Sequence, residues 1–294
     1  MDRHLDRPGA IKRVGIIGYP IKHSLSPVFQ QAALDFHGIP ARYEAWETPP
    51  EAVAAAVARL RQPGYLGMNV TVPHKQAVMP LLDEIDPLAR RIGAVNTIVR
   101  RGDRLVGYNT DAAGFLRALQ RKAGYDPTEQ RALLIGAGGA ARAVAFALLE
   151  AGVAFLAIAN RRSERAAALA ADLGGQTGDA EVCALGAGEN ELAGVVQTTD
   201  LLVNATPLGM RHTAGEHDLP LPAHLLRQGL LVCDLVYNPP QTPLLRAAAA
   251  AGAATLDGLP MLIYQGAAAF ELWTGQQAPL GLMFERARAA LAGA

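Results

Sequence analysis

The stretch Leu133-Leu134-Ile135-Gly136-Ala137-Gly138-Gly139-Ala140-Ala141 decides the fold class of this chain. An apolar strand runs directly into a glycine-rich turn, and an amphipathic helix follows. In this context Gly136 permits the tight turn, and Gly138 lets the backbone approach a pyrophosphate at the helix N-terminus. The stretch therefore predicts a Rossmann-type dinucleotide-binding domain, whose turn binds the cofactor through Gly136, Ala137, Gly138, Gly139 and Ala140. The alternative is a strand–helix turn that binds no ligand.

The end of the next expected strand, residues 155–159, indicates which dinucleotide is preferred. NAD-binding proteins carry an acidic side chain there, about 20 residues after the glycines, which accepts a hydrogen bond from the ribose 2′-hydroxyl. This chain instead has Asn160, Arg161 and Arg162, with Arg165 a turn later. Guanidinium groups bind phosphate through paired donors, so we expect NADP as the cofactor. A solvated helix start is the alternative, although positive charge there is slightly unfavourable.

The remaining chain alternates short apolar runs with helical stretches, which favours a mostly parallel α/β sheet covered on both faces. Polar residues at 124–130 and the approach to Gly258 mark two boundaries. We expect an α/β protein of two domains. One is an open α/β substrate domain, residues 1–112, closed by C-terminal helices in residues 259–294. The other is an NADP-binding Rossmann-type domain, residues 113–258.

Composition excludes several other classes of protein. Of the 294 residues, 27 are basic and 27 are acidic, which argues against a protein that binds nucleic acid by excess positive charge. No apolar run reaches the roughly 18 residues of a membrane helix, and the start of the chain lacks a signal-peptide pattern. Cys183 and Cys233 are expected to be buried thiols, and the histidines show no metal-ligand spacing. We expect a cytoplasmic enzyme, monomer or homodimer, with a small-molecule substrate and with no metal, nucleic acid or membrane as partner.

Polar side chains gather in four clusters of the N-terminal part, each at or just after a strand-like run. The clusters are residues 18–27, 67–75, 93–97 and 107–114. Ligands of open parallel sheets bind beyond the carboxyl ends of the strands, so these clusters are expected to converge on a small polyol acid. Ser26 before Pro27 also fits a helix cap, and Asp111 fits a cap of the helix after it. Lys75 is one of only four lysines, and His74 beside it is an alternative acid–base group.

These clusters and the motifs at 204–210, 234–239 and 257–265 resemble the shikimate dehydrogenase family. The resemblance implies NADP-dependent, reversible reduction of 3-dehydroshikimate to shikimate, in the biosynthesis of chorismate and aromatic amino acids. It implies that Lys75 and Asp111 form the catalytic pair. By the same resemblance the substrate-binding residues are Ser24, Ser26, Asn69, Thr71, Asn96, Asp111, Tyr237 and Gln265. The cofactor side then also includes Asn160, Arg161, Arg162, Arg165, Thr206, Gly258 and Met261. Many members carry Thr where Arg162 stands.

Two alternatives remain at this point, besides an unrelated two-domain NADP oxidoreductase, which Ser24, Ser26 and Gln265 disfavour. One is a quinate/shikimate dehydrogenase of broader substrate or cofactor range. Ser26 favours shikimate, because relatives that use quinate freely often carry Thr at that position. The other is a catalytically silent protein that senses shikimate or quinate. The presence of both Lys75 and Asp111 weighs against it.

Overall fold

The computed structural model describes residues 11–174 and 178–293, and it divides the chain into two compact units. The first unit is Met1–Thr110 with Gln265–Ala294, and the second is Asp111–Tyr264. The domain boundaries expected from the sequence, after residues 112 and 258, lie close to these divisions and remain a prediction for the functional domains. None of the described helices is long and apolar enough to cross a membrane.

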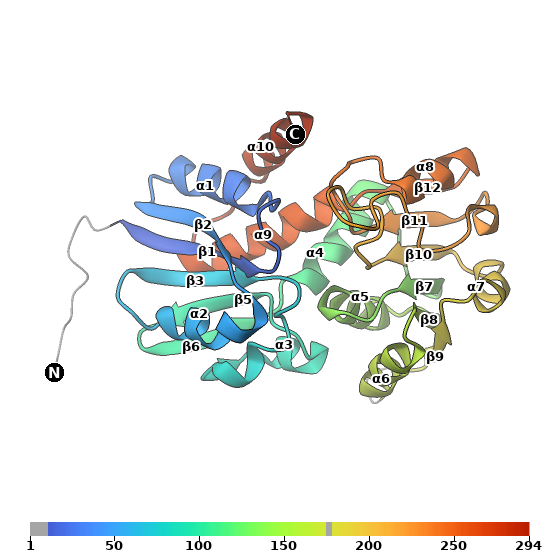
Figure 1. Cartoon of the computed structure of the whole chain (residues 1–294), viewed down its shortest axis with the longest axis horizontal. Coiled ribbons are helices and arrows are strands. Elements are labelled where there is room, and N and C mark those ends of the chain that lie inside the picture. Colours follow the sequence, from blue (N-terminus) through green and yellow to red (C-terminus); the bar gives the residue numbers. More distant parts are fainter. Residues whose placement is uncertain (1–10, 175–177, 294) are drawn as a thin grey trace. The chain divides into compact units, whose positions relative to one another are not determined.

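The first unit is built on a six-stranded sheet in the order β2-β1-β3-β5-β6-β4 (Figure 1). Pairing is parallel for β1 with β2 and β3 and for β4 with β6, but antiparallel for β3 with β5 and β5 with β6. The strands are β1 Lys12–Gly18, β2 Ala41–Glu47, β3 Tyr65–Val70, β4 Glu84–Ile85, β5 Thr97–Arg101 and β6 Arg104–Tyr108; the helices are α1 Ser26–Phe36, α2 Val53–Arg59, α3 Pro87–Ile92 and α10 Leu280–Ala292.

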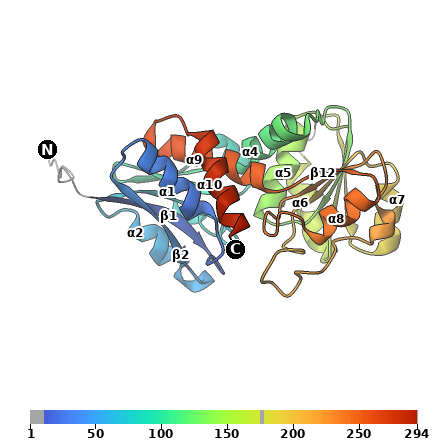
Figure 2. The same cartoon turned by 90° about the horizontal axis from the view of Figure 1, so that it is seen from above.

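Side chains of β3 alternate between the two faces of this sheet, as a strand requires. Met68 and Val70 pack into a core cluster with Val53 and Val57 of α2. On the other face, helices α1, α10 and the end of α9, Leu259–Thr274, lie side by side (Figures 1 and 2). Asn69, between Met68 and Val70, therefore belongs to the face that α1 and α9 cover.

The antiparallel part of this sheet differs from the mostly parallel sheet expected from the sequence. Strands β5 and β6 form a hairpin closed by Gly102 and Asp103, with Gly102 at a φ of 62°. A Gly-Asp pair suits a two-residue hairpin turn. Arginines at 100, 101 and 104 flank this turn and interrupt the apolar runs of both strands, so the hydrophobic pattern does not indicate the hairpin. Strand β5 begins only at Thr97, although Ala94 and Val95 before it are apolar, because residues 94–96 form a loop.

The second unit contains a six-stranded, wholly parallel sheet in the order β12-β11-β10-β7-β8-β9. Read from the other edge, this is the doubly wound strand order. Strands β8 and β9 are added on one side of β7, and strands β10, β11 and β12 are added on its other side. The strands are β7 Arg131–Ile135, β8 Phe155–Asn160, β9 Glu181–Gly186, β10 Leu201–Asn204, β11 Leu231–Asp234 and β12 Ala254–Leu256; the helices are α4 Asp111–Ala118, α5 Gly139–Glu150, α6 Ser163–Leu173, α7 Glu189–Val196 and α8 Pro243–Ala250, with a π-helical turn at Leu119–Ala123.

The core of the second unit confirms the predicted Rossmann-type fold. Leu133, Ile135 and Ala157 of the central strands are fully or almost fully buried with Leu192 of α7 and Leu244 of α8. Cys233 is a buried thiol in β11, as expected, whereas Cys183 is only partly buried because β9 is the edge strand of the sheet.

Candidate active site

A network of buried amides and hydroxyls lies at the carboxyl end of β3 in the first unit. Asn69 donates from Nδ2 to Thr97 Oγ1 at 3.1 Å and to the backbone oxygen of Asn96 at 3.2 Å. Thr97 in turn donates to Asn96 Oδ1 at 3.1 Å. The same Asn96 oxygen accepts from the Thr110 backbone N–H at 2.8 Å. Three of the four sequence clusters therefore do converge, through loops that follow β3 and β6 and precede β5.

The network continues to α9 through Gln265. Asn96 donates from Nδ2 to Gln265 Oε1 at 3.2 Å, although the two residues are far apart in the sequence. The next residue, Gly266, is held by the buried Gln30 of α1, whose Nε2 donates to the Gly266 backbone oxygen at 2.8 Å. The return of the chain to the first unit thus places Gln265 beside Asn96.

Tyr43 of β2 extends the network in the opposite direction, toward the first cluster. Its hydroxyl donates to Asn69 Oδ1 at 2.7 Å. Burial raises the pKa of Tyr43 well above its usual value, and a hydrogen bond with Ser26 partly offsets this increase. Ser26, Asn69, Asn96 and Gln265 therefore belong to one connected set. Sequence reasoning missed Tyr43 because β2 carried no recognised motif.

The two serines of the first cluster form a tight turn at the start of α1. The Ser26 backbone N–H donates to Ser24 Oγ at 3.2 Å. The expectation that Ser26 caps the helix is wrong, because Leu25 stands at the cap position and Ser26 is the first helical residue. Ser26 is almost fully buried, and Ser24 is partly exposed. Ser26 therefore does not cap the helix, and the substrate-binding role predicted for it remains.

The loop after β3 gives the two neighbouring acid–base candidates, His74 and Lys75, different environments. His74 is 1% exposed, and its Nε2 lies 2.6 Å from the backbone oxygen of Thr48. A carbonyl oxygen only accepts, so this nitrogen donates and the ring is fixed in the core. Lys75 and Thr71 are partly exposed. Lys75 remains the acid–base candidate of this loop, and its catalytic role remains a prediction.

Asp111 follows Thr110 in the chain and begins α4, which the structure assigns to the second unit. Its side chain is 3% exposed, and a carboxylate in the first turn of a helix is favoured by the helix dipole. Asn109, two residues earlier, donates to the Ala94 backbone oxygen at 2.9 Å and so fixes the loop before β5. Thr110 belongs to the hydrogen-bonded network, and Asp111 is the next residue in the chain. The residue that follows the network therefore carries a carboxylate.

The glycine turn of the second unit has the backbone geometry that a pyrophosphate site needs. Gly136 has a φ of 121°, and a Cβ there would lie 3.0 Å from the Ala205 backbone at the end of β10. Gly138 is the N-cap of α5, in an extended conformation with no side-chain capping bond. Ala137 is partly exposed and Gly138 is exposed, and Gly139 and Ala140 are the first two residues of the helix. The first N–H groups of α5 can therefore serve an anionic ligand.

The loop after β8 presents the arginines expected to bind phosphate. Asn160 ends the strand and donates from Nδ2 to the Arg162 backbone oxygen at 2.9 Å, which folds the loop back on itself. Arg161, Arg162 and Arg165 are exposed. No carboxylate stands at the end of the strand to compete for them. The donor set fits a 2′-phosphate.

A second polar network lies at the ends of β10 and β11. Thr206 donates from Oγ1 to Asn204 Oδ1 at 2.6 Å, and Asn204 donates from Nδ2 to Asp234 Oδ1 at 2.9 Å. The fully buried Asp234 also accepts from Thr242 Oγ1 at 2.6 Å. Burial raises the pKa of Asp234 to about 6. The network fixes Thr206, a predicted cofactor residue, through Asn204 and Asp234, for which sequence reasoning assigned no role.

The remaining predicted residues lie around the exit of β11. A Cβ on Gly258 would lie 2.2 Å from the Leu235 backbone oxygen, so a glycine is required for this contact. Met261 is 8% exposed near the start of α9, and Tyr237 is partly buried in the loop after β11. Their contacts with ligands remain predictions.

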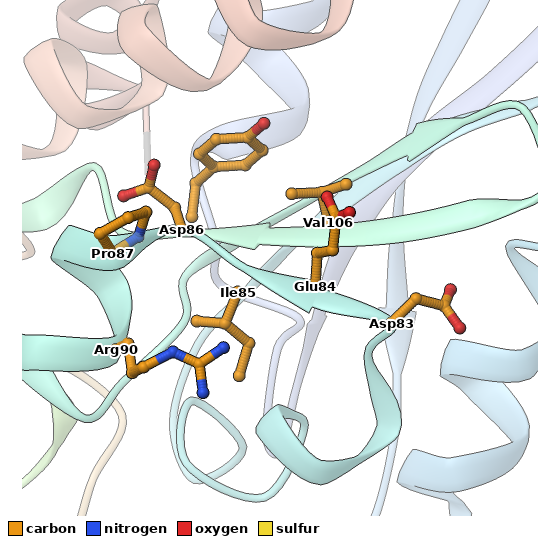
Figure 3. A pocket seen from close by; sticks show the side chains of 8 residues that line it. Asp83, Glu84, Ile85, Asp86, Pro87, Arg90 and Val106 are labelled. Carbon is orange, nitrogen blue, oxygen red and sulfur yellow. The ribbon is translucent and has the colours of Figure 1, made fainter.

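A surface hollow of about 280 Å³ at the β4 edge is lined by residues 83–87, Arg90, Val106 and Tyr108 (Figure 3). Its carboxylates already have protein partners. Asp83 accepts from Arg61 at 2.7 Å and 3.0 Å, Glu84 pairs with Arg104, and Asp86 caps α3. None of the predicted site residues lines this hollow. Residues 11–174 and 178–293 also contain no group of three metal-ligating side chains that could hold an ion.

Known proteins similar to this chain identify its family. Models of three domains match in order: a shikimate dehydrogenase substrate-binding domain at residues 16–98, a shikimate/quinate 5-dehydrogenase domain at 118–209 and a shikimate 5′-dehydrogenase C-terminal domain at 258–288. A shikimate dehydrogenase (NADP(+)) of Moorella thermoacetica is 49% identical over 92% of this chain and 90% of its own length. The chain belongs to the shikimate dehydrogenase family.

Solved structures of the family share the fold. A shikimate 5-dehydrogenase of Thermus thermophilus, in complex with NADP(H) and shikimate, has a TM-score of 0.83 and 42% identity, covering 95% of this chain and 100% of that one. A quinate dehydrogenase of Corynebacterium glutamicum, in complex with NAD, has a TM-score of 0.82 and 33% identity, covering 95% and 99%. The backbone alone thus does not distinguish these two activities within the family.

Proposed function

We propose that this chain is an NADP-dependent dehydrogenase that interconverts 3-dehydroshikimate and shikimate, in aromatic amino-acid biosynthesis. The observation that carries the proposal is the 49% identity, across nearly the full length of both chains, with a relative named for that activity. The arginines after β8 support NADP, because they provide donors for a 2′-phosphate. We further propose that the protein acts in the cytoplasm, as a monomer or homodimer, without metal or nucleic acid.

The network of the first unit suits a small acid with several hydroxyls. Both N–H groups of Asn69 are engaged by Thr97 and Asn96, and its oxygen accepts from Tyr43. The second lone pair of this oxygen can accept from a ligand hydroxyl. Ser24 Oγ accepts from the Ser26 N–H, which leaves the Ser24 O–H to donate to a carboxylate. This direction of donation supports our assignment of Ser24 to the substrate carboxylate. We assign Ser26 to the same group because it lies beside Ser24 in the turn at the start of α1. We assign Asn69, Thr71, Asn96, Tyr237 and Gln265 to the ring and its hydroxyls.

Reduction of a ketone needs a hydride and a proton, and NADPH supplies the hydride when it is bound. We assign the proton to the Lys75 ammonium, which also stabilises the negative charge that develops on the carbonyl oxygen. The Asp111 carboxylate orients the ammonium and accepts from a substrate hydroxyl. In the oxidation of shikimate the neutral Lys75 amine takes up the hydroxyl proton. In the reduction, the carbonyl oxygen becomes a hydroxyl with the proton from Lys75, and the carbonyl carbon receives the hydride that the bound cofactor would supply, so protons and electrons balance.

A panel of two substrates and two cofactors tests the proposal. Purified protein is mixed with shikimate or quinate and with NADP or NAD, and the absorbance of the reduced nicotinamide is followed. We expect kcat/KM to be highest for shikimate with NADP. Faster turnover of quinate would support the broader dehydrogenase instead. Binding of shikimate without any turnover would support a sensor.

A further inference from the structure

Tyr43 occupies a central position between two residues assigned to the substrate, yet no sequence motif contains it. It lies in the middle of β2 and is 6% exposed. Its hydroxyl donates to Asn69 Oδ1 at 2.7 Å and also shares a hydrogen bond with Ser26. Strand β2 contributes no other residue to the network. Tyr43 therefore connects the end of β3 with the start of α1.

The single proton of the phenol determines the direction of these hydrogen bonds. Because Tyr43 donates this proton to Asn69, the phenol oxygen accepts from the Ser26 hydroxyl. Asn69 accepts from Tyr43 on its oxygen and donates from its nitrogen to Thr97 and Asn96. Rotation of the Asn69 carboxamide by half a turn would place its N–H groups against a donor and its oxygen against acceptors. Tyr43 thus selects the orientation in which Asn69 meets a ligand.

The ring of Tyr43 is itself held in place from the α9 side. The Trp273 ring centroid lies 6.1 Å from that of Tyr43, at an interplanar angle of 53°. Trp273 donates from Nε1 to the Ile98 backbone oxygen at 3.0 Å, which ties the indole to β5. Burial keeps the Tyr43 phenol protonated, because it raises the pKa well above the usual value. The hydroxyl is therefore a fixed donor.

We propose that Tyr43 is a positioning residue of the substrate site, which orients the Asn69 carboxamide for a small polyhydroxylated carboxylic acid. This inference rests on the proposed function. It predicts that loss of the phenol hydroxyl weakens binding of the acid, while cofactor binding and the chemical step are little affected. A purely structural role would instead lower stability without changing affinity for one ligand.

The test compares Tyr43→Phe with Tyr65→Phe, which removes a hydroxyl from an equally buried tyrosine of the same sheet. Tyr65 is 7% exposed and begins β3, and its hydroxyl contacts Arg13 instead of the network. We expect Tyr43→Phe to raise the KM for shikimate by about tenfold, the effect of one lost hydrogen bond. The KM for NADP and kcat should change less than about twofold, well below the effect of one such bond. Tyr65→Phe should leave all three constants unchanged. An unchanged KM for shikimate in Tyr43→Phe, or equal increases for shikimate and NADP, would overturn the inference.

A double-mutant cycle measures the coupling between Tyr43 and Asn69 directly. The dissociation constant of shikimate is measured by calorimetry in the wild type, Tyr43→Phe, Asn69→Ala and the double variant. Removal of the phenol hydroxyl should weaken binding much less in the Asn69→Ala background, because the carboxamide it orients is already absent. Full additivity would contradict the inference. Thr97→Val, which removes the acceptor for Asn69 from the other side, should also weaken shikimate binding and serves if Tyr43→Phe does not fold.

Failure of this inference is distinguishable from failure of the proposed function. If the wild type does not oxidise shikimate with NADP, the proposed function is wrong, whatever the variants show. If the wild type is active and Tyr43→Phe has a normal KM for shikimate, the role of Tyr43 alone is wrong.

Discussion

The two units place polar side chains at the ends of their strands by different chemistry. In the first unit, Asn69, Asn96 and Thr97 are joined by hydrogen bonds between neutral amides and hydroxyls. In the second, Thr206 is held through Asn204 by the buried carboxyl group of Asp234. Protonation can change the second network but not the amides of the first. The two networks should therefore respond differently to pH and to substitution.

A second difference concerns what each unit contributes to the proposed reaction. The first carries Lys75 and most of the residues assigned to the substrate, whereas the second carries Asp111, Tyr237, the glycine turn and the arginines after β8. Substitutions in the first unit should alter kcat or the KM for shikimate. Substitutions in the glycine turn or at the arginines after β8 should alter the KM for NADP.

The largest expected effect is that of Lys75→Ala. Loss of the proton donor should lower kcat by about 10²–10⁴-fold, the usual range for acid–base groups, with little change in KM. Steady-state kinetics with shikimate and NADP measure both constants. Lys122→Ala, at an exposed lysine of the second unit, is the matched control and should keep full activity. Near-normal turnover by Lys75→Ala would remove the proton chemistry from this residue.

The next effect concerns the pH dependence of stability in the second unit. The folded pKa of Asp234 is about 6, above the usual 3.8, so the folded state binds this proton more tightly than the unfolded state. Its contribution to stability is fully present below pH 3.8 and is lost as pH rises through 6. The change amounts to about 3 kcal/mol.

Asp234→Asn isolates this contribution, because the amide keeps the shape of the carboxyl group but does not ionise. The free energy of unfolding is measured by denaturant titration between about pH 4 and pH 8 for both proteins, the range that spans the two pKa values. The wild type should lose stability relative to Asp234→Asn as the pH increases. A constant difference across this range would show that Asp234 titrates normally.

Arg161→Ala should give the smallest of these effects and the most selective one. Loss of a charge-assisted contact with the 2′-phosphate should raise the KM for NADP by about tenfold or more, with no change for NAD. Initial rates with both cofactors measure the ratio. Arg121→Ala, another exposed arginine of the second unit, should leave both constants unchanged. Equal increases for NADP and NAD would point to a folding defect instead.

Local patterns predicted the second unit better than the first. The glycine turn at 136–140 and the arginines after β8 are each contained in a short stretch of sequence, so their chemistry is visible from local patterns. Asp234 belongs to a motif too, but its buried hydrogen bond with Asn204 depends on the pairing of β10 with β11. No local pattern reports such a pairing.

In the first unit the sequence indicated the polar clusters but not how they connect. Tyr43 has no motif around it, and its role arises from a contact with Asn69 on a strand two places away in the sheet. The Asn96–Gln265 hydrogen bond depends on the return of the chain through α9. His74 and Lys75 show the same limit, because adjacent residues differ in burial once the loop after β3 folds. Lys75, Asp111 and the ligand contacts remain predictions.

The most direct test of the proposed activity is a product analysis with the wild-type protein, shikimate and NADP. The reduced cofactor is measured by absorbance and the organic product by chromatography in the same samples. NADPH and 3-dehydroshikimate should form in equal amounts, at a rate well above that with quinate or NAD. No formation of NADPH, or NADPH without 3-dehydroshikimate, would contradict the proposed activity.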